Sequence, residues 1–432
     1  MRTILRFGFS LAIFETVKYL LIISWFVVFC LIMKRWKFFK DAEIPWFWLC
    51  FLLGLKVVAG FLYGKLFLDH YGGGDPYKVF KAGLYIFNSY GEDPGIYFRL
   101  IFGPNGGFAE VPVYKYAYQT GYWDHSGFFN IARLHAIIRP LTFGYYSVHI
   151  TFMAFFMMIG SLHFFRLLKD QDNYSKWPVL SVVFLMPSLL FWTGGFHKDG
   201  FVYLGIGIVL YHVHRYVQIP KIKHLLFLFL GLWIIALVRP FQLALVLPPL
   251  LLAVSVLKWK GKVFWKFAVG YLLLPALAIL LSSVIEGFDI LEILVARQHA
   301  FLVENGGSSF FVGSLEATVS SFLTFFPTAS VNGFFRPFVW DANGTLQFFS
   351  SIGILAFWLF LIFTIYFRRA NFRWSRITLF LFFYSVSNIF LIGYLVSNSG
   401  TLVRYRSVSL NLLLIVMVLV IDWKRVRSKW IG

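Results

Sequence analysis

The sequence predicts an all-α protein, a polytopic transmembrane helical bundle of about eleven spans that forms a single integral membrane domain over residues 1–432. Hydrophobic residues make up 59% of the chain and charged residues only 13%, and the mean hydropathy is +0.75. A soluble protein of this length could not bury so much apolar surface, so lipid must cover the excess. Aromatic residues make up 21% of the chain. That share fits phenylalanine facing lipid, with tryptophan and tyrosine at the two interfaces.

The apolar stretches long enough to cross a bilayer, about 20 residues each, lie near residues 10–33, 44–67, 141–165, 177–195, 200–216, 224–239, 241–257, 267–285, 350–367, 377–397 and 405–421. The first follows Arg2 and Arg6, as in a signal peptide, but no small-residue cleavage site comes after it, and Glu15 and Lys18 interrupt it. We therefore expect an uncleaved first span. An interfacial helix over residues 1–18 is the alternative.

The net charge of +20 is explained by where the basic residues lie. More than half of the 39 Lys and Arg residues fall in six compact segments between apolar stretches, at residues 34–40, 166–176, 214–224, 258–266, 367–376 and 422–430. The positive-inside rule places these segments in the cytoplasm, where they also attract anionic headgroups. The basicity therefore predicts membrane topology and contact with membrane lipid, and no nucleic-acid partner is expected.

The opposite, non-cytoplasmic face receives two long connections, at about 68–140 and 286–349, which carry most of the 19 acidic residues together with the short turns on that side. Loops of this length in a compact protein are usually functional or partly helical. Both connections are interrupted by glycine, proline and aromatic residues, which is typical of re-entrant helices or helices lying at the interface. Polar chemistry is thus expected on this face.

The segment GGGDPYKVFKAG, residues 72–83, carries the first candidate catalytic residue, Asp75. A carboxylate at the membrane surface can take a proton from a hydroxyl. Lys78 and Lys81 lie one helical turn apart and can hold phosphate. The alternative is structural, because aspartate at an N-cap followed by proline is an ordinary helix start.

The segment GGFHKDG, residues 194–200, separates two apolar stretches so closely that His197, Lys198 and Asp199 must lie at or just within the membrane surface. Ionisable residues in such a position are costly and indicate function. Asp199 is the second candidate base, with His197 and Lys198 as substrate or phosphate ligands. Alternatively, Lys198 extends to the interface and Asp199 caps the next helix.

Arginine recurs at positions where a phosphate on the outer face would arrive. Its planar guanidinium group can donate hydrogen bonds to two phosphate oxygens at once, and it stays charged. An arginine that meets lipid headgroups would give the same pattern. The predicted phosphate ligands, with one accompanying acid, are Arg239, Arg336, Asp341, Arg404 and Arg406.

Other motifs are weaker. His212 and His214 are two residues apart, so on a helix they face different directions and cannot share a metal. Cys30 and Cys50 lie in apolar stretches and suggest neither a disulfide framework nor a metal site. No nucleotide-binding loop, zinc spacing or serine hydrolase elbow is present. No cofactor is expected, although Asp75 could ligate a divalent cation.

Four segments together resemble patterns in bacterial polytopic proteins of surface-polysaccharide assembly, the O-antigen-polymerase-like proteins and membrane glycosyltransferases that use polyprenyl-phosphate sugars. These segments are residues 72–83, PSLLFWTGGFHKDG at 187–200, FFRPFVWD at 334–341 and NSGTLVRYR at 398–406. The resemblance implies that Asp75 corresponds to the early-loop catalytic carboxylate, and that Arg336 and Arg404 correspond to phosphate-binding arginines. The chain departs from the pattern because its early acid is single and follows the second span, and because no soluble periplasmic domain follows the membrane region.

We therefore expect a multi-pass enzyme of the bacterial inner membrane, a glycosyltransferase or polysaccharide polymerase. Its substrate would be a sugar on a polyprenyl (di)phosphate carrier at the non-cytoplasmic face, and polysaccharide-assembly machinery would be a partner. A lipid-linked oligosaccharide flippase or other transporter is the alternative. A transporter should place charges at mid-membrane and show repeat symmetry. A non-catalytic scaffold would not need the acidic residues.

Overall fold

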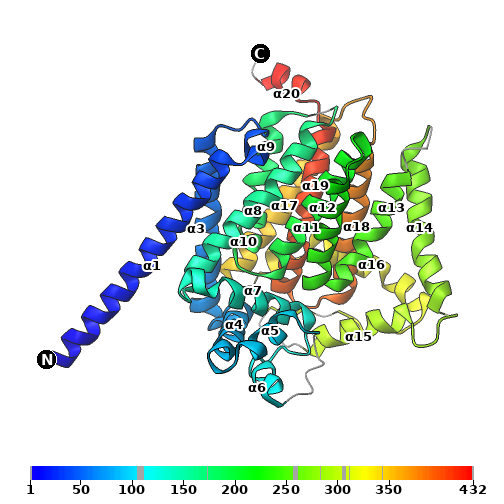
Figure 1. The fold of residues 1–432 in the computed structure, drawn as a ribbon. Coiled ribbons are helices and arrows are strands. Elements are labelled where there is room, and N and C mark those ends of the chain that lie inside the picture. Colours follow the sequence, from blue (N-terminus) through cyan, green and yellow to red (C-terminus); the bar gives the residue numbers. More distant parts are fainter. Residues whose placement is uncertain are drawn as a thin grey trace. The chain divides into compact units, whose positions relative to one another are not determined.

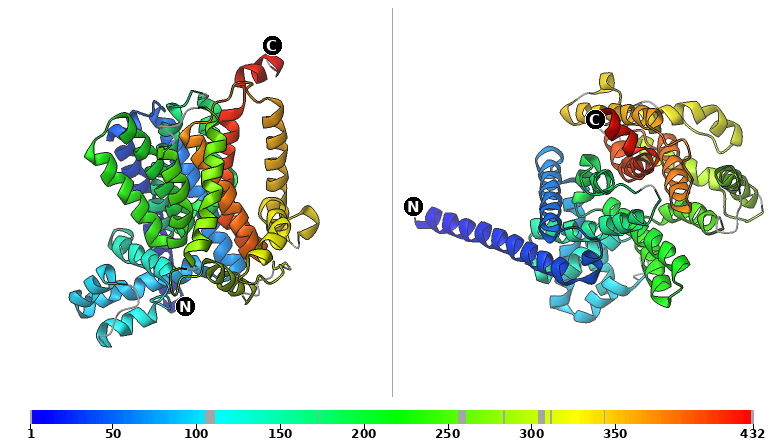
Figure 2. Two further views of the ribbon diagram at one scale, coloured as in Figure 1. Left: turned by 90° about the vertical axis from the view of Figure 1, so that its right-hand side faces the viewer. Right: turned by 90° about the horizontal axis from the view of Figure 1, so that it is seen from above.

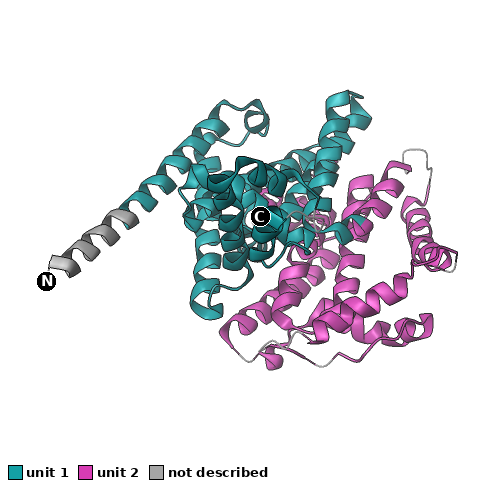
Figure 3. Cartoon of the chain, turned by 60° about the horizontal axis from the view of Figure 1, so that its bottom comes forward, with its two compact units in different colours: residues 1–170, 184–243 teal, residues 171–183, 244–432 magenta. Residues whose placement is uncertain are grey.

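The computed structural model describes residues 2–104, 111–172, 174–255, 261–282, 284–303, 308–310, 312–342 and 344–430, with side chains described from Glu15 to Lys429. The side chains of Arg2 and Arg6 and part of the basic segment 258–266 therefore lie outside it. Within these ranges the secondary structure is helical, with two isolated β-bridges and no strand. The chain divides into two compact units, residues 1–170 with 184–243 and residues 171–183 with 244–432 (Figure 3).

Among the described residues, eight helical segments are long and apolar enough to cross a membrane: Glu15–Arg35, Trp46–Tyr71, Tyr146–Lys169, Lys176–Gly194, Val263–Ser282, Thr345–Tyr366, Arg376–Leu395 and Ser399–Val420. Two shorter apolar helices cover Ile222–Val238 and Pro240–Ser255. These lengths and compositions confirm the predicted class, an all-helical multi-pass membrane protein.

Unit 1 contains most of the N-terminal half of the chain (Figure 1). Its helices are α1 (Arg2–Arg35), α2 (Lys37–Lys40), α3 (Trp46–Tyr71), α4 (Gly74–Glu92), α5 (Pro94–Phe102), α6 (Val111–Gln119), α7 (Ser126–Thr142), α8 (Tyr146–Lys169), α10 (Pro187–Gly194), α11 (Lys198–Gln218) and α12 (Ile222–Val238). The helix α1 runs unbroken from Arg2, so residues 1–18 do not form a separate interfacial helix.

The predicted connection at 68–140 is largely helical. It forms α4 to α7, which lie together at one end of the long helices of unit 1 (Figure 2). The turn into α4 needs glycine, because Gly72, Gly73 and Gly74 have φ values of 61°, 104° and 53°. Helix α4 then packs closely on α7, since a Cβ added at Gly83 would lie 2.6 Å from Cβ of His135.

Small residues let the long helices of unit 1 approach each other, as is usual between membrane helices. A Cβ at Gly60 of α3 would lie 2.6 Å from the carbonyl oxygen of Gly194 at the end of α10. Likewise, a Cβ at Gly205 of α11 would lie 2.9 Å from the carbonyl oxygen of Gly231 of α12. The first crossing lies at the end of α10, and the second holds α12 against α11, which carry the charged residues of the candidate site.

Unit 2 takes the C-terminal half, and the division falls inside α9 and α13. Its helices are α9 (Lys176–Phe184), α13 (Pro240–Ser255), α14 (Val263–Ser282), α15 (Ile290–Val303), α16 (Val319–Phe335), the short 3₁₀ helix η2 (Val339–Asp341), α17 (Thr345–Tyr366), α18 (Arg376–Leu395), α19 (Ser399–Val420) and α20 (Trp423–Trp430). The predicted connection at 286–349 thus forms α15, α16 and η2. Helix α18 packs on α16, where Gly393 meets the backbone of Gly333, and it bonds to α19 through Asn388 Nδ2, which donates to Ser409 Oγ at 2.7 Å.

Candidate functional site

The break between α10 and α11 holds the first group of charged residues in unit 1. Helix α10 ends at Gly194 and α11 begins at Lys198, with His197 at the N-cap position and no side-chain cap hydrogen bond. Asp199 therefore lies in the first turn of α11, and its interpretation as a helix cap is wrong. The carboxylate is only 2% exposed, so it needs a charged partner.

That partner is Arg239, the residue at which α12 ends. Arg239 Nη2 donates to Asp199 Oδ1 at 2.7 Å, and the arginine is 5% exposed. His197 Nδ1 lies 3.3 Å from the other carboxylate oxygen, Oδ2. An ionised carboxylate only accepts hydrogen bonds, so Nδ1 is the donor to an ionised Asp199. The three side chains form one buried charged cluster.

The Lys198 side chain is half-buried and contacts an aromatic ring. Its Nζ lies 3.1 Å from the centroid of the Phe128 ring, at the start of α7. Gly127 leaves room for this contact, since a Cβ there would lie 3.2 Å from Nζ and 2.4 Å from the carbonyl oxygen of Val238. Asn130 Nδ2 donates to the carbonyl oxygen of Leu237 at 2.8 Å. Helix α7 is thus held against the end of α12 and presents Phe128 to Lys198.

Asp75 lies in the first turn of α4, and its N-cap is Gly73, so the N-cap interpretation is wrong here as well. The side chain is half-buried, and among the described residues no cation pairs with it. Burial raises the pKa of Tyr122 to about 12, and the nearby Asp75 carboxylate adds to the increase. The Tyr122 ring lies 4.9 Å from that of Phe128. Two aromatic rings therefore connect Asp75 with Lys198 inside unit 1.

Lys78 lies on the exposed side of α4. It joins neither the buried cluster nor any described ion pair. Its assignment as a phosphate ligand remains a prediction.

Unit 2 contains a second arginine–aspartate pair. Arg336 Nη1 donates to Asp341 Oδ2 at 3.1 Å, and each side chain is 25% exposed. The guanidinium carbon lies 4.5 Å from the centroid of Phe310. Next to this pair, Phe338 and Trp340 stack at 4.8 Å with 8° between their planes, and Trp340 is 80% exposed. This pair can be reached from outside the unit.

Arg404 and Arg406 lie two residues apart on α19 and therefore face different surroundings. Arg404 is half-buried, and its guanidinium lies 5.1 Å from the Tyr405 ring. Arg406 is 1% exposed, and its Nη1 donates to the carbonyl oxygen of Gly333 at 2.8 Å, in the last turn of α16. The last carbonyl groups of a helix have no hydrogen-bond partner within the helix, and a cation near them is favourable. Within the described part of the chain, Nε and Nη2 of Arg406 have no hydrogen-bond partner.

The structure therefore brings together His197, Asp199 and Arg239 in unit 1, and Arg336 and Asp341 in unit 2. No pattern in the sequence points to Tyr122 and Phe128, because they are one tyrosine among 22 and one phenylalanine among 54. Lys56, which the sequence analysis did not single out, is 2% exposed inside α3 and has no described acidic partner. Its Nζ lies 5.9 Å from the Phe184 ring.

His212 and His214 contact different residues. His212 Nδ1 lies 2.9 Å from His224 Nδ1, whereas His214 Nε2 lies 3.2 Å from Asp170 Oδ2. His212 and His214 thus have different partners, as their spacing predicted. Over the described residues, no three His, Cys, Asp or Glu side chains gather closely enough to hold a metal ion.

Comparisons with protein-family models, with curated proteins and with solved structures find no match to this chain. Function is therefore inferred from the residues and their geometry alone.

Proposed function

We propose that the protein is a membrane glycosyltransferase or polysaccharide polymerase that transfers sugar from a polyprenyl (di)phosphate carrier at the non-cytoplasmic face of the bacterial inner membrane. The observation that carries the proposal is the arrangement in unit 1. The half-buried Asp75 is near Tyr122, the Tyr122 ring contacts the Phe128 ring, and Nζ of the half-buried Lys198 lies over the Phe128 ring. An acid, an aromatic surface and a cation are the groups that a hydroxyl, a sugar ring and a phosphate require.

In this proposal Asp75 acts as the general base. The acceptor hydroxyl gives its proton to the carboxylate, and the hydroxyl oxygen bonds to the anomeric carbon of the donor sugar. The bond from that carbon to the phosphate oxygen breaks, and the phosphate keeps the bonding electrons. A positioned base contributes about 10²–10⁴ in rate. Lys198 stabilises the charge that develops on the leaving phosphate.

Asp199 is the less suitable base, because Arg239 and His197 already hold both of its oxygens inside the unit. A carboxylate paired with arginine at 2.7 Å is a weak proton acceptor. We assign Asp199 and Arg239 a positioning role: they hold the N-terminal turn of α11 and hence the direction of Lys198. Asp199 also orients the His197 ring through its contact with Nδ1.

The arginines of unit 2 are proposed as phosphate ligands in their own right, Arg336 next to Asp341 and Arg404 and Arg406 on α19. Arg336, Arg404 and Arg406 are permanently charged, and Arg406 has donors left over for phosphate oxygens. The stacked Phe338 and Trp340 offer an apolar face to a sugar ring. If a divalent cation takes part, Asp75 would hold it together with substrate phosphates, in the way Mg²⁺ commonly uses one or two carboxylates.

The test is mass spectrometry of polyprenyl-linked saccharides from cells that lack the gene and carry either the wild type or a variant. We expect carrier bearing the untransferred saccharide to accumulate on the outer leaflet and to be cleared by wild type but not by Asp75→Asn. Glu92→Gln is the matched control, because Glu92 is an exposed acid at the other end of the same helix, α4. Clearance by Asp75→Asn, or an unchanged lipid profile in the deletion strain, would contradict the proposal.

One observation favours the transporter alternative. Lys56 is buried in the middle of α3, and an ionisable residue inside a membrane helix commonly marks a transport path. The same experiment separates the two functions. A flippase would leave its lipid-linked saccharide on the inner leaflet, and Lys56→Met would reproduce the deletion while Asp75→Asn would not.

A further inference from the structure

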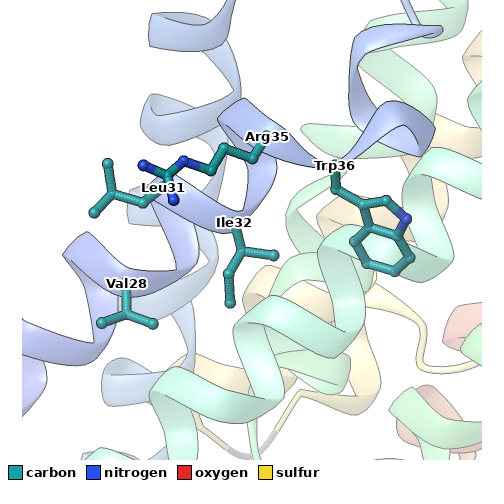
Figure 4. Close-up of a pocket in the computed structure, with 5 residues that line it drawn as sticks. All are labelled: Val28, Leu31, Ile32, Arg35 and Trp36. Carbon is teal, nitrogen blue, oxygen red and sulfur yellow. The ribbon is translucent and has the colours of Figure 1, made fainter.

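A shallow groove lies on the exposed side of α1 near its C-terminal end (Figure 4). Its volume is about 400 Å³, and it is lined by Val28, Leu31, Ile32, Arg35 and Trp36. The first four residues are spaced as one face of a helix. The groove is thus lined by three apolar side chains and, further along the same face of α1, by the guanidinium of Arg35. The indole of Trp36 completes the lining. A ligand that fits must have an apolar part and an anionic end.

The acidic residues that follow this groove in the sequence, Asp41 and Glu43, are already paired with cations of α8. Asp41 bonds to Arg166 Nη2 at 3.3 Å, and Glu43 bonds to Lys169 Nζ at 2.6 Å. Arg35 is exposed, and among the described residues no acid pairs with it. The positive charge at the end of the groove is therefore left for a ligand from outside the chain.

The aromatic residues around the groove indicate the depth at which the charge lies. Trp36 is 42% exposed at the end of α1, and Trp46 Nε1 donates to the carbonyl oxygen of Cys30 at 2.8 Å. Tryptophan collects at the headgroup level of a bilayer. Val28 and Arg35 are separated by about 10 Å along the helix axis, which matches the upper part of an acyl chain below its headgroup.

We propose that this groove binds one anionic phospholipid of the leaflet at the basic end of α1, with its phosphate on Arg35 and an acyl chain along Val28, Leu31 and Ile32. The occupant is a phospholipid rather than the polyprenyl carrier, because the C-terminal end of α1 lies at the other end of unit 1 from α7, which contacts Lys198 and the end of α12 (Figure 1). The site is thus separate from the proposed transfer reaction.

Native mass spectrometry of the full-length protein in detergent, with phosphatidylglycerol or phosphatidylcholine added, tests the proposal. We expect one phosphatidylglycerol to be retained about fivefold better than phosphatidylcholine, since one basic residue near a membrane surface accounts for about that factor. Arg35→Ala should remove the preference. Val28→Trp should fill the groove and lower retention while keeping the charge. Arg427→Ala is the control, because Arg427 is an exposed arginine in the basic helix α20.

Equal retention of the two lipids by the wild type would overturn the proposal. So would an unchanged preference in Arg35→Ala, an unchanged retention in Val28→Trp, or an equal loss of preference in Arg427→Ala. Undecaprenyl phosphate that displaces phosphatidylglycerol from wild type but not from Val28→Trp would replace the phospholipid by the carrier as the occupant, and the proposal would fail in that case too.

Discussion

Asp75 and Asp199 occupy the same position in two helices of unit 1, the second residue of α4 and of α11. In both, the helix dipole favours a negative charge in the first turn. Their surroundings differ. Asp199 is buried, with Arg239 and His197 on its two oxygens, whereas Asp75 is half-buried beside Tyr122 and has no described cation partner. An aspartate at the same helical position is thus part of a buried ion pair in one helix, and in the other it is the residue that we propose as the general base.

This difference follows from what precedes each aspartate. Three glycines with positive φ before Asp75 turn the chain sharply at the end of α3 and leave the side chain near the surface of the unit. His197, by contrast, is extended and buried, and it leads directly into a helix whose first turns are buried. A buried carboxylate persists only when it is paired, and the end of α12 supplies the arginine.

The largest expected effect is on stability at the buried pair. Arg239→Ala leaves Asp199 as a buried charge without its main partner, and we expect it to lower the free energy of unfolding by about 3–5 kcal/mol. The measurement is unfolding of the purified protein in mixed micelles. Asp75→Ala should change the same quantity by less than about 0.5 kcal/mol, because Asp75 has no described ion pair.

The double variant Asp199→Ala with Arg239→Ala separates pairing from packing. It should recover part of the loss, since neither charge is then buried alone. If Arg239→Ala unfolds like the wild type, or if Asp75→Ala is the more destabilising change, the assignment of the two roles is wrong.

The fold class followed from the sequence because it depends on composition and on the length of apolar stretches. The basic segments and the breaks at Gly194 and Arg239-Pro240 were also visible, since glycine, proline and charge end helices in known ways. The individual helices within the connection at 68–140 were harder to predict. The helices α4 to α7 are only partly amphipathic and are stabilised by contacts such as that of Gly83 with His135, which depend on packing between distant segments.

The residues of the candidate site could be predicted from the sequence, but which of them contact one another could not. The sequence placed Asp199 and Arg239 on one face of the membrane, yet the ion pair between them spans 40 residues and closes only when α11 packs on α12. The aromatic contacts of Asp75 and Lys198 come from a third segment, residues 122–128. Pairing of this kind depends on tertiary structure, which single residues and their spacing do not encode.

A smaller effect is expected for Lys198, on substrate binding. A charge-assisted hydrogen bond to a phosphate contributes about 1.5–3 kcal/mol, so Lys198→Ala should raise KM for the lipid-linked donor by roughly tenfold or more. The measurement is transfer by purified protein at varied donor concentration. Lys115→Ala is the control, because Lys115 is exposed on α6 and pairs only with the exposed Glu92 among described acids. An unchanged KM in Lys198→Ala, or an equal rise in the control, would remove Lys198 from the site.

The smallest effect concerns Tyr122. Burial and, second, the charge of Asp75 raise the pKa of Tyr122 to about 12. Asp75→Asn removes a negative charge that disfavours the phenolate, so the pKa of Tyr122 should fall, while the part due to burial should remain. A fluorinated tyrosine incorporated at position 122 ionises at lower pH and reports its own titration by ¹⁹F NMR. Glu92→Gln should leave that midpoint unchanged. A midpoint that is the same in Asp75→Asn as in the parent would mean that the two side chains are not neighbours. The series of contacts from Asp75 through Tyr122 and Phe128 to Lys198 would then lack its first contact. Asp75 would also lose the surroundings that distinguish it from Asp199.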